Sequence, residues 1–358
     1  MIHARTRPGT AARIAPALAA AASLSAALPA LAQVEPPDIT RRQAEPAAQA
    51  PVDAAPGTPQ AEGGAAGSPA AGAPGAGGRP QQPTFQVGGG YLHQFSESAG
   101  DNGGTMSADR FYGSFSSRTA FTEDFSLTVA MGYEFDWYHW GGASPFTVQD
   151  PWGSVNLFGL QVRGAFKVAP EWTASVGGIF ALAGETDADA GDSIYGGGIA
   201  SAAWTPSPDL MLGIGVLGVT QLEDDPLVIP IPVVHWHFAE EWEVSTIRRP
   251  PASPFVGIDV AWEPVGSNVD IALGIGWQQR RFRLGSTSDP ASSERVGQDQ
   301  SWAAFASVGY DVAPGVRIDL VGGLTFYEKL QLVSSSGAVQ DATVDPNPLL
   351  GVFATVSF

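Results

Sequence analysis

The stretch FSLTVAMGYEFDW (residues 125–137) alternates large apolar residues with small or polar ones from end to end. Successive side chains of a β-strand point to opposite faces, so one face of this strand is wholly apolar. Its thirteen residues exceed the five or six that are usual in a soluble strand. A tilted strand that crosses a bilayer needs about 9–11 residues. The stretch therefore predicts a membrane-spanning β-strand.

The same alternation recurs along the chain from Thr84 onward. Tight connections such as 121–125 and 168–172 alternate along the chain with longer Gly-, Ser- and Asp-rich loops such as 138–151. Short periplasmic turns and longer outer loops are typical of outer-membrane barrels. Fourteen segments are expected, near 85–95, 110–120, 124–138, 152–168, 171–183, 193–205, 209–222, 226–238, 241–248, 254–263, 268–284, 300–312, 315–328 and 346–358.

The expected fold is thus all-β: a transmembrane antiparallel up-and-down β-barrel of fourteen strands over residues 84–358. Twelve strands are the alternative, because 85–95 and 241–248 are the weakest segments. An even number places both ends of the barrel on the periplasmic side. A soluble β-sandwich also alternates. Here, however, the face opposite the apolar one is mostly Gly, Ala, Ser and Thr, which favours a lipid-facing exterior.

Tryptophan placement supports the same topology. All ten tryptophans fall near predicted strand ends, where aromatic girdles meet the two membrane interfaces. The periplasmic set is Trp172, Trp204, Trp236, Trp242 and Trp262, and the outer set is Trp137, Trp140, Trp152, Trp277 and Trp302.

The N-terminal region has a different composition. Three arginines precede the apolar run 14–32, which ends in Ala30-Leu31-Ala32. This order predicts a secretory signal peptide over residues 1–32. A transmembrane anchor is the alternative, but Pro16 and Pro29 interrupt the run. Residues 33–83 hold no aromatic residue and are rich in Pro, Ala and Gly, which predicts a disordered periplasmic arm that acts as a spacer.

Composition excludes several classes of function. The chain has no cysteine, which excludes disulfides and thiol chemistry. Its formal net charge of −18 disfavours partners that are polyanions, so we expect no nucleic-acid binding. No cofactor motif is recognised, and we expect no cofactor.

Two resemblances add to this picture. The C-terminal LLGVFATVSF (349–358) resembles the final-strand signal of bacterial outer-membrane barrels, which implies that the barrel-assembly machinery recognises Phe358. Residues 205–284 resemble an uncharacterised outer-membrane β-barrel family of unknown function, through Asp225-Pro226, the Pro230/Pro232 pair, Trp236 and Arg249-Pro250. This second resemblance implies the fold and contributes no chemistry.

The residues that point into the lumen decide what such a barrel does. Strand parity predicts charged lumen-lining groups of both signs at Glu134, Asp136, Arg163, Asp259, Asp270, Arg280, Arg317 and Asp319. No long ladder of one charge is present, so the prediction is a passive, weakly selective channel for small solutes of unknown identity. The alternatives are a structural barrel that tethers the arm and, third, an outer-membrane hydrolase, for which no G-x-S-x-G motif occurs.

Two further groups of residues are candidates for binding. His235 and His237 share the inward face of one strand and form a weak metal-site candidate, with Glu241 or Glu243 as a third ligand. Parity directs Arg281 and Arg283 outward at an outer strand end. These arginines contact either the phosphates of lipopolysaccharide or loop carboxylates. The expected partners are therefore outer-membrane lipids and lipopolysaccharide, together with the barrel-assembly machinery.

Limited proteolysis of the detergent-solubilised protein should remove the residues before about Thr84 and leave a resistant core, because exposed unstructured chain is cut first. Mass spectrometry of the fragments gives the boundary. Protection of 33–83 would show that the arm docks on the barrel.

Overall fold

The computed structural model describes residues 83–358, except 102, 145, 148–149, 247–255, 286–295 and 334–338. The predicted signal peptide and all of the predicted arm before Pro83 lie outside the described residues. The barrel begins at Thr84, where the alternating pattern begins in the sequence.

Every regular element in the described part of the chain is a β-strand. The strands are β1 (Thr84–Ser98), β2 (Thr105–Thr122), β3 (Phe125–Gly141), β4 (Ser154–Ala169), β5 (Trp172–Glu185), β6 (Ile194–Ser207), β7 (Leu210–Gln221), β8 (Asp224–Ala239), β9 (Trp242–Ser245), β10 (Val256–Trp262), β11 (Val269–Arg283), β12 (Val296–Ala313), β13 (Val316–Val333), β14 (Val339–Val344) and β15 (Asn347–Ser357).

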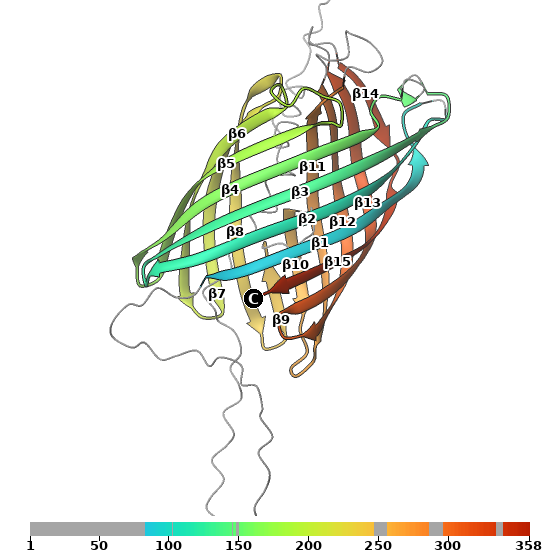
Figure 1. The fold of residues 1–358 in the computed structure, drawn as a ribbon. Helices are drawn as coiled ribbons and strands as arrows, with labels where there is room; N and C mark the ends of the chain where they lie inside the picture. The colour runs from blue at the N-terminus through green and yellow to red at the C-terminus, as the bar shows by residue number, and fades with distance from the viewer. Residues whose placement is uncertain are drawn as a thin grey trace, which may run out of the picture.

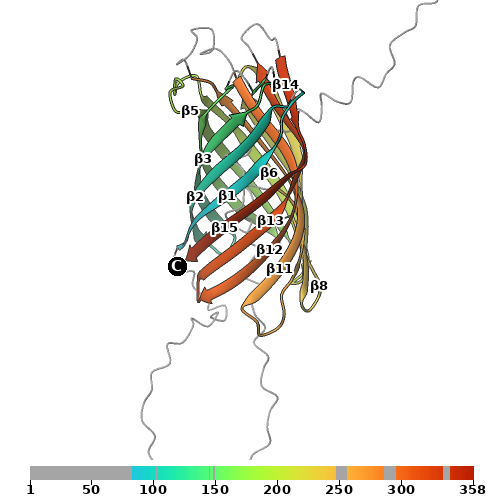
Figure 2. The same cartoon turned by 90° about the vertical axis from the view of Figure 1, so that its right-hand side faces the viewer.

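The sheet closes on itself. Each strand from β1 to β13 pairs antiparallel with the next, and β15 pairs with β13 on one side and β1 on the other. Figures 1 and 2 show the resulting tilted barrel, with the C-terminus beside β15 at the end where β1 starts.

β14 and β15 occupy one position in the wall. Val344 of β14 pairs with Glu328 and Asn347 of β15 pairs with Thr325, so both follow β13 in a single register. Only Asp345-Pro346 interrupts them. The barrel therefore has fourteen strand positions, as the sequence predicts, and the twelve-strand alternative is wrong.

The outer surface is an apolar belt. Val176, Ile214, Leu273, Leu320 and Leu350 lie in mid-strand and are each more than half exposed. Such a belt is unstable in water and is expected where strands face lipid. Among the described residues, the structure holds no helix of sufficient length and apolarity to span a bilayer.

The tryptophan girdles are present with two exceptions. Trp172 and Trp204, for example, stack at the periplasmic rim with ring centroids 6.5 Å apart and both are exposed. Trp152, however, is 1% exposed and Trp140 packs against it with centroids 5.2 Å apart. Both belong to a buried cluster at the outer end, so their predicted girdle position is wrong. Trp140 has the inward parity of Asp136, which explains its placement.

β11 stays paired with β12 up to Arg283, but beyond Trp277 its other edge is no longer paired with β10 and reaches β5, where Arg283 pairs with Gly184. The β7–β8 turn covers the outward side of this β11 segment. Arg281 donates from Nε to the Leu222 carbonyl at 2.8 Å, and Arg283 forms an ion pair of 2.8 Å with Glu223. Arg281 and Arg283 thus point outward as predicted but are buried. Of the two contacts expected for these arginines, the structure shows the pairing with loop carboxylates.

The prolines of β8 share one direction. His237, at an odd position, donates its N–H to the β6–β7 turn, whereas Val234, at an even position, donates to Thr246 on the other side. Backbone directions alternate along a strand, so Pro230 and Pro232 face away from β7. Their missing N–H groups therefore cost no hydrogen bond in the β7–β8 ladder.

Phe358 joins the last strand of the barrel to the first. Its N–H donates to the Phe85 carbonyl at 2.9 Å, and the N–H of Phe85 donates back at 2.8 Å. The two rings lie 5.9 Å apart.

We predict that Phe358→Ala lowers the amount of protein in the outer membrane more than Phe180→Ala does. Phe180 is also an exposed aromatic residue but lies within β5, so it controls for the loss of lipid-facing area. Immunoblots of membrane fractions and the gel shift between unboiled and boiled samples measure the effect. Equal losses would refute a special role of Phe358 in assembly.

Candidate functional site: the barrel lumen

A buried ionic cluster occupies the lumen. Arg280 of β11 contacts both acidic groups of β3: its Nε lies 2.5 Å from Glu134 Oε1 and 2.7 Å from Asp136 Oδ2. Nη2 of Arg280 donates to the Tyr112 hydroxyl at 3.2 Å. Glu134, Asp136 and Arg280 are all at most 3% exposed.

A second arginine extends the cluster. Arg110 of β2 contacts Asp136 at 2.9 Å and Asp299 of β12 at 3.0 Å. The Tyr138 hydroxyl donates to Asp299 at 2.7 Å, and its ring lies 5.2 Å from the Arg110 guanidinium carbon. Each guanidinium thus serves more than one acceptor, which is how arginine stabilises several buried carboxylates at once.

Amide and carboxyl groups continue the cluster towards β13. Gln94 of β1 accepts from Arg110 at 2.9 Å and donates to Glu328 of β13 at 2.5 Å. We call Gln94, Arg110, Glu134, Asp136, Arg280, Asp299 and Glu328 the transverse network.

The transverse network joins strands that are not neighbours in the sheet. At the outer end Arg283 of β11 pairs with Gly184 of β5, so β4 and β5 lie between β3 and β11 on one side, and five strand positions separate them on the other. Contacts between Arg280 and Glu134 or Asp136 must therefore cross the lumen. At this level, side chains bridge the interior of the barrel.

Apolar residues fill the space on the outer side of the network. Phe282 and Trp152 pack edge to face with centroids 5.3 Å apart, and both are at most 1% exposed. The cluster consists of Ala99, Met106, Ala108, Tyr138, Phe146, Trp152, Val155, Leu157, Ala181, Ala183, Tyr195, Leu222, Phe282, Leu284, Val296, Leu330, Leu332, Ala342 and Val344. The outer end of the lumen is therefore packed like a protein core.

A second apolar cluster borders the middle of the lumen, between β12, β13, β15 and β1. Phe305 and Phe353 point inward there with Leu92 and Val321. The Phe353 ring lies directly over Gly90, where any Cβ would collide with it. A glycine at this position lets the aromatic ring lie flat against the wall.

The inner face of β5–β8 is also apolar. Ile179, Ile199, Leu217, Val219 and Leu227 form one buried cluster there, and two partly buried isoleucines of β8 pack against it. The expectation that the inward face is mostly small residues with scattered charges holds for most inward positions of β5 and β6 but is wrong for β8. In β8, LVIPIPVV (227–234) is apolar at every position, so alternation does not distinguish its two faces.

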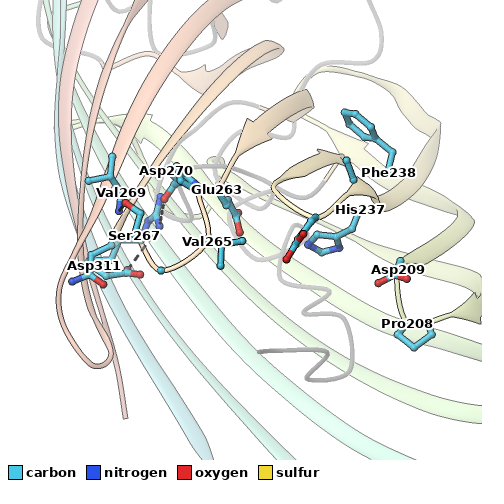
Figure 3. A pocket seen from close by; sticks show the side chains of 16 residues that line it. Pro208, Asp209, His237, Phe238, Glu263, Val265, Ser267, Val269, Asp270 and Asp311 are labelled. Carbon is cyan, nitrogen blue, oxygen red and sulfur yellow. Dashed lines mark hydrogen bonds and ion pairs between the residues drawn. The ribbon is translucent and has the colours of Figure 1, made fainter. Parts of the chain in front are cut away.

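The periplasmic end is open. A cavity of about 910 Å³ lies between the β6–β7, β8–β9 and β10–β11 turns. Figure 3 shows Asp209 and His237 on one side of it and Asp270 and Asp311 on the other. Arg317 reaches Asp270 at 2.5 Å and is the one arginine among its lining residues in the described chain. This cavity, called the vestibule below, is predominantly acidic.

The eight residues predicted to line the lumen occupy three places. Glu134, Asp136 and Arg280 belong to the transverse network. Asp270 and Arg317 line the vestibule. Asp319 forms an ion pair of 2.7 Å with Arg317. Arg163 and Asp259 are buried on the inward faces of β4 and β10, at 6% and 4% exposure.

Four members of the transverse network are absent from the residues predicted to line the lumen, for a specific reason. Arg110 and Glu328 stand at the very ends of segments predicted as 110–120 and 315–328, and Asp299 falls one residue outside the segment 300–312. The real strands are longer: β2 starts at Thr105 and β12 at Val296. Extending the alternation to these starts would have placed Arg110 and Asp299 inward. Gln94 lies inside its segment but carries no charge.

The histidines of the described chain form two clusters. His93 and His139 both contact Asp109, at 2.8 and 2.9 Å, on the outward faces of β1–β3. His235 and His237 contact Glu243 of β9 on the inward side. Glu241, the other predicted third ligand, instead accepts from Trp262 Nε1 at 3.0 Å and from the Val265 N–H at 3.1 Å.

Comparisons with known proteins agree on architecture only. No protein-family model matches the chain, and no characterised protein matches its sequence. Solved structures of similar shape include an outer-membrane channel from Pseudomonas putida F1 (9% identity, covering 76% of this chain and 95% of that one, TM-score 0.43). A Pseudomonas aeruginosa FadL homologue is also similar (10% identity, covering 76% of this chain and 90% of that one, TM-score 0.45). So is the KdgM porin (9% identity, covering 76% of this chain and 99% of that one, TM-score 0.30).

Likeness at these identities and TM-scores carries no conclusion about activity. The closed fourteen-position barrel and its apolar belt identify the chain as a β-barrel of the bacterial outer membrane, in contact with its lipids. This agrees with the resemblance of residues 205–284 to an outer-membrane barrel family without assigned activity.

We predict that Arg280→Met destabilises the barrel by about 3–5 kcal/mol, because it leaves Glu134 buried without its cation and Asp136 with Arg110 alone. Lys329→Met is the control: Lys329 pairs with Asp341 at 2.9 Å, but both are exposed, and such pairs contribute about 0–1 kcal/mol. Urea unfolding in detergent measures both.

Adding Glu134→Gln and Asp136→Asn to Arg280→Met should recover much of the loss, since no unpaired charge then remains on β3. A destabilisation no larger than that of Lys329→Met would contradict the role of the transverse network.

Proposed function

We propose that the protein is an outer-membrane channel for small solutes, whose lumen is closed in this conformation by the transverse network. The vestibule admits solutes from the periplasmic side, and the network with its outer apolar cluster separates the vestibule from the outside. Loosening of these side-chain contacts opens the path.

One observation carries the proposal: charged side chains from non-adjacent strands meet across the lumen. Apolar residues fill the interior of a purely structural barrel at a lower free-energy cost, because each buried charge costs several kcal/mol of desolvation that pairing only partly offsets. A lumen that alternates between a dry and a hydrated state needs polar groups that are stable in both.

The width of the barrel supports the proposal. Barrels of about eight strands are filled by side chains, and those of sixteen to eighteen leave an aqueous channel. Fourteen positions lie between these limits, which leaves space for water and solutes over most of the barrel. At the outer end β11 pairs with β5, so the ring is narrower there and side chains are able to close it.

Planar-bilayer recordings test the proposal directly. The wild-type protein should show low conductance. Replacing Arg110, Glu134, Asp136 and Arg280 together by Ser should raise it several-fold, since the substitution removes two charges of each sign and the side chains that cross the lumen.

The control replaces Asp270 and Arg317 by Ser, which also leaves the net charge unchanged but acts at the vestibule wall. Folding of each variant is checked by its gel mobility without boiling. If the fourfold variant is as silent as the wild type, and stays silent after deletion of residues 33–83, the channel proposal fails.

The acidic vestibule gives the open channel a weak preference for cations. We predict that Asp209→Lys with Glu263→Lys shifts the reversal potential of the fourfold Ser variant towards anions in a salt gradient, because charges lining a pore tune its selectivity.

Glu123→Lys with Asp124→Lys is the matched control. These residues form the exposed β2–β3 turn at the same end of the barrel, outside the vestibule, and the change in charge is identical. An equal shift in both variants would mean that overall charge, not the vestibule, sets the preference.

Two other functions were expected as alternatives, a barrel that tethers the arm and an outer-membrane hydrolase. Among the described residues, no observation favours either over the channel. A silent barrel whose arm deletion changes cell-envelope attachment would point to the tether.

A further inference from the structure

Three ligand-type side chains meet on the inward side of β8 and β9 near the periplasmic mouth. His235 and His237 lie two residues apart on β8, so they share one face of the strand. Glu243 of β9 is the cross-strand partner of His237. Antiparallel pairing of the two strands across a tight turn therefore brings the three groups together.

The spacing of their atoms suits a metal ion. Nδ1 of His235 lies 3.2 Å from Glu243 Oε1, and Nε2 of His237 lies 3.3 Å from Oε2. A tetrahedral zinc site with bonds of about 2.0–2.2 Å places neighbouring ligand atoms roughly 3.3–3.6 Å apart. The two imidazoles here face different oxygens of the Glu243 carboxylate. All three ligand groups fall within 4.8 Å of one another, so small side-chain rotations complete the geometry.

Burial and access both fit a binding site. Glu243 and His235 are 2% and 7% exposed, and Nδ1 of His235 makes no hydrogen bond of proper geometry among the described residues. The ring of His237 lines the vestibule (Figure 3). A metal ion thus has a path to the site from the periplasm, and one side of the site is open to solvent or a further ligand.

We propose that His235, His237 and Glu243 form a zinc site at the periplasmic mouth of the barrel. Two neutral imidazoles and one carboxylate bind Zn²⁺ as three protein ligands, and the open side leaves the fourth position to a solute or solvent from the vestibule. The two histidines belong to β8 and the glutamate to β9, so the ion links the two strands.

This link matters because β9 is short. It has four residues, against 16 in β8. A bond from Glu243 through the ion to both histidines fixes β9 to β8 more firmly than its few ladder hydrogen bonds do. The site therefore stabilises the wall beside the vestibule and places a Lewis acid at the solute entrance. It stands independently of the channel proposal.

Metal binding is tested on the full-length, detergent-solubilised barrel after treatment with EDTA. Isothermal titration with Zn²⁺ should show one site per chain, and Co²⁺ used as an optical probe should give the visible absorption of a tetrahedral ion. His235→Gln with His237→Gln should abolish both signals. Glu243→Gln, which keeps the shape of the side chain, should weaken binding at least about tenfold, as loss of even an outer-shell partner does.

The chain offers a matched control in its other pair of histidines. His93→Gln with His139→Gln removes the two histidines that contact Asp109 and should leave zinc binding unchanged. Unboiled gel mobility verifies that every variant is folded. Zinc should also raise the unfolding temperature of the wild type and of the His93/His139 variant, but not that of the His235/His237 variant.

Two results would overturn the proposal. One is stoichiometric zinc binding that survives the His235/His237 double substitution. The other is no zinc binding by the folded wild type, in which case the cluster is only a set of hydrogen-bonded ion pairs.

Discussion

A membrane offers no water to an unpaired backbone group, and this constraint decides most of the structure. Each exposed N–H or C=O costs several kcal/mol in hydrocarbon, so the sheet must close. Closure depends on β15, which joins β13 to β1, and on the reciprocal hydrogen bonds between Phe85 and Phe358. Once the sheet is closed, alternation alone assigns one side chain in two to lipid and the next to the lumen.

The lumen then follows from electrostatics. A charge on the inward face has no bulk solvent when the interior is packed, so it must find a partner across the space. Arg110 and Arg280 each serve carboxylates from two or more directions. Coulomb attraction is strong at these distances in a medium of low dielectric constant. The same pairs become weak once water enters, so hydration and ion-pair strength oppose each other in this part of the barrel.

The sequence predicted the architecture well because its governing signal is local. Alternation in 125–137, the tight turns and the terminal Phe358 each need only a few neighbouring residues, and strand number followed from counting them. Side-chain partners were harder, since the Arg280–Glu134 contact joins residues 146 positions apart and depends on which walls face each other. Strand parity predicts that Arg280 points inward, but it does not predict which residue Arg280 contacts.

Two kinds of error had clear physical causes. Trp140 and Trp152 were assigned to a girdle because their strand ends lie near an interface, yet the packed outer cluster draws them inward. Arg281 and Arg283 point outward as parity requires, but the bend of β11 towards β5 lets the β7–β8 turn cover them. Strand parity gives the direction of a side chain, but it does not show whether a neighbouring turn covers that side chain.

The orientation of Pro230 and Pro232 has a mechanical consequence. Whatever segment lies on the far side of β8, it receives no N–H from these two positions. Carbonyl oxygens remain there, and Val234 still donates its N–H to Thr246 on the same side, so this edge of β8 lacks two of its donors. The edge of β8 that faces β7 is therefore fully hydrogen-bonded at these positions, whereas the opposite edge offers two donors fewer. Lateral tension in the bilayer would therefore act more readily on this edge of β8 than on its ladder with β7.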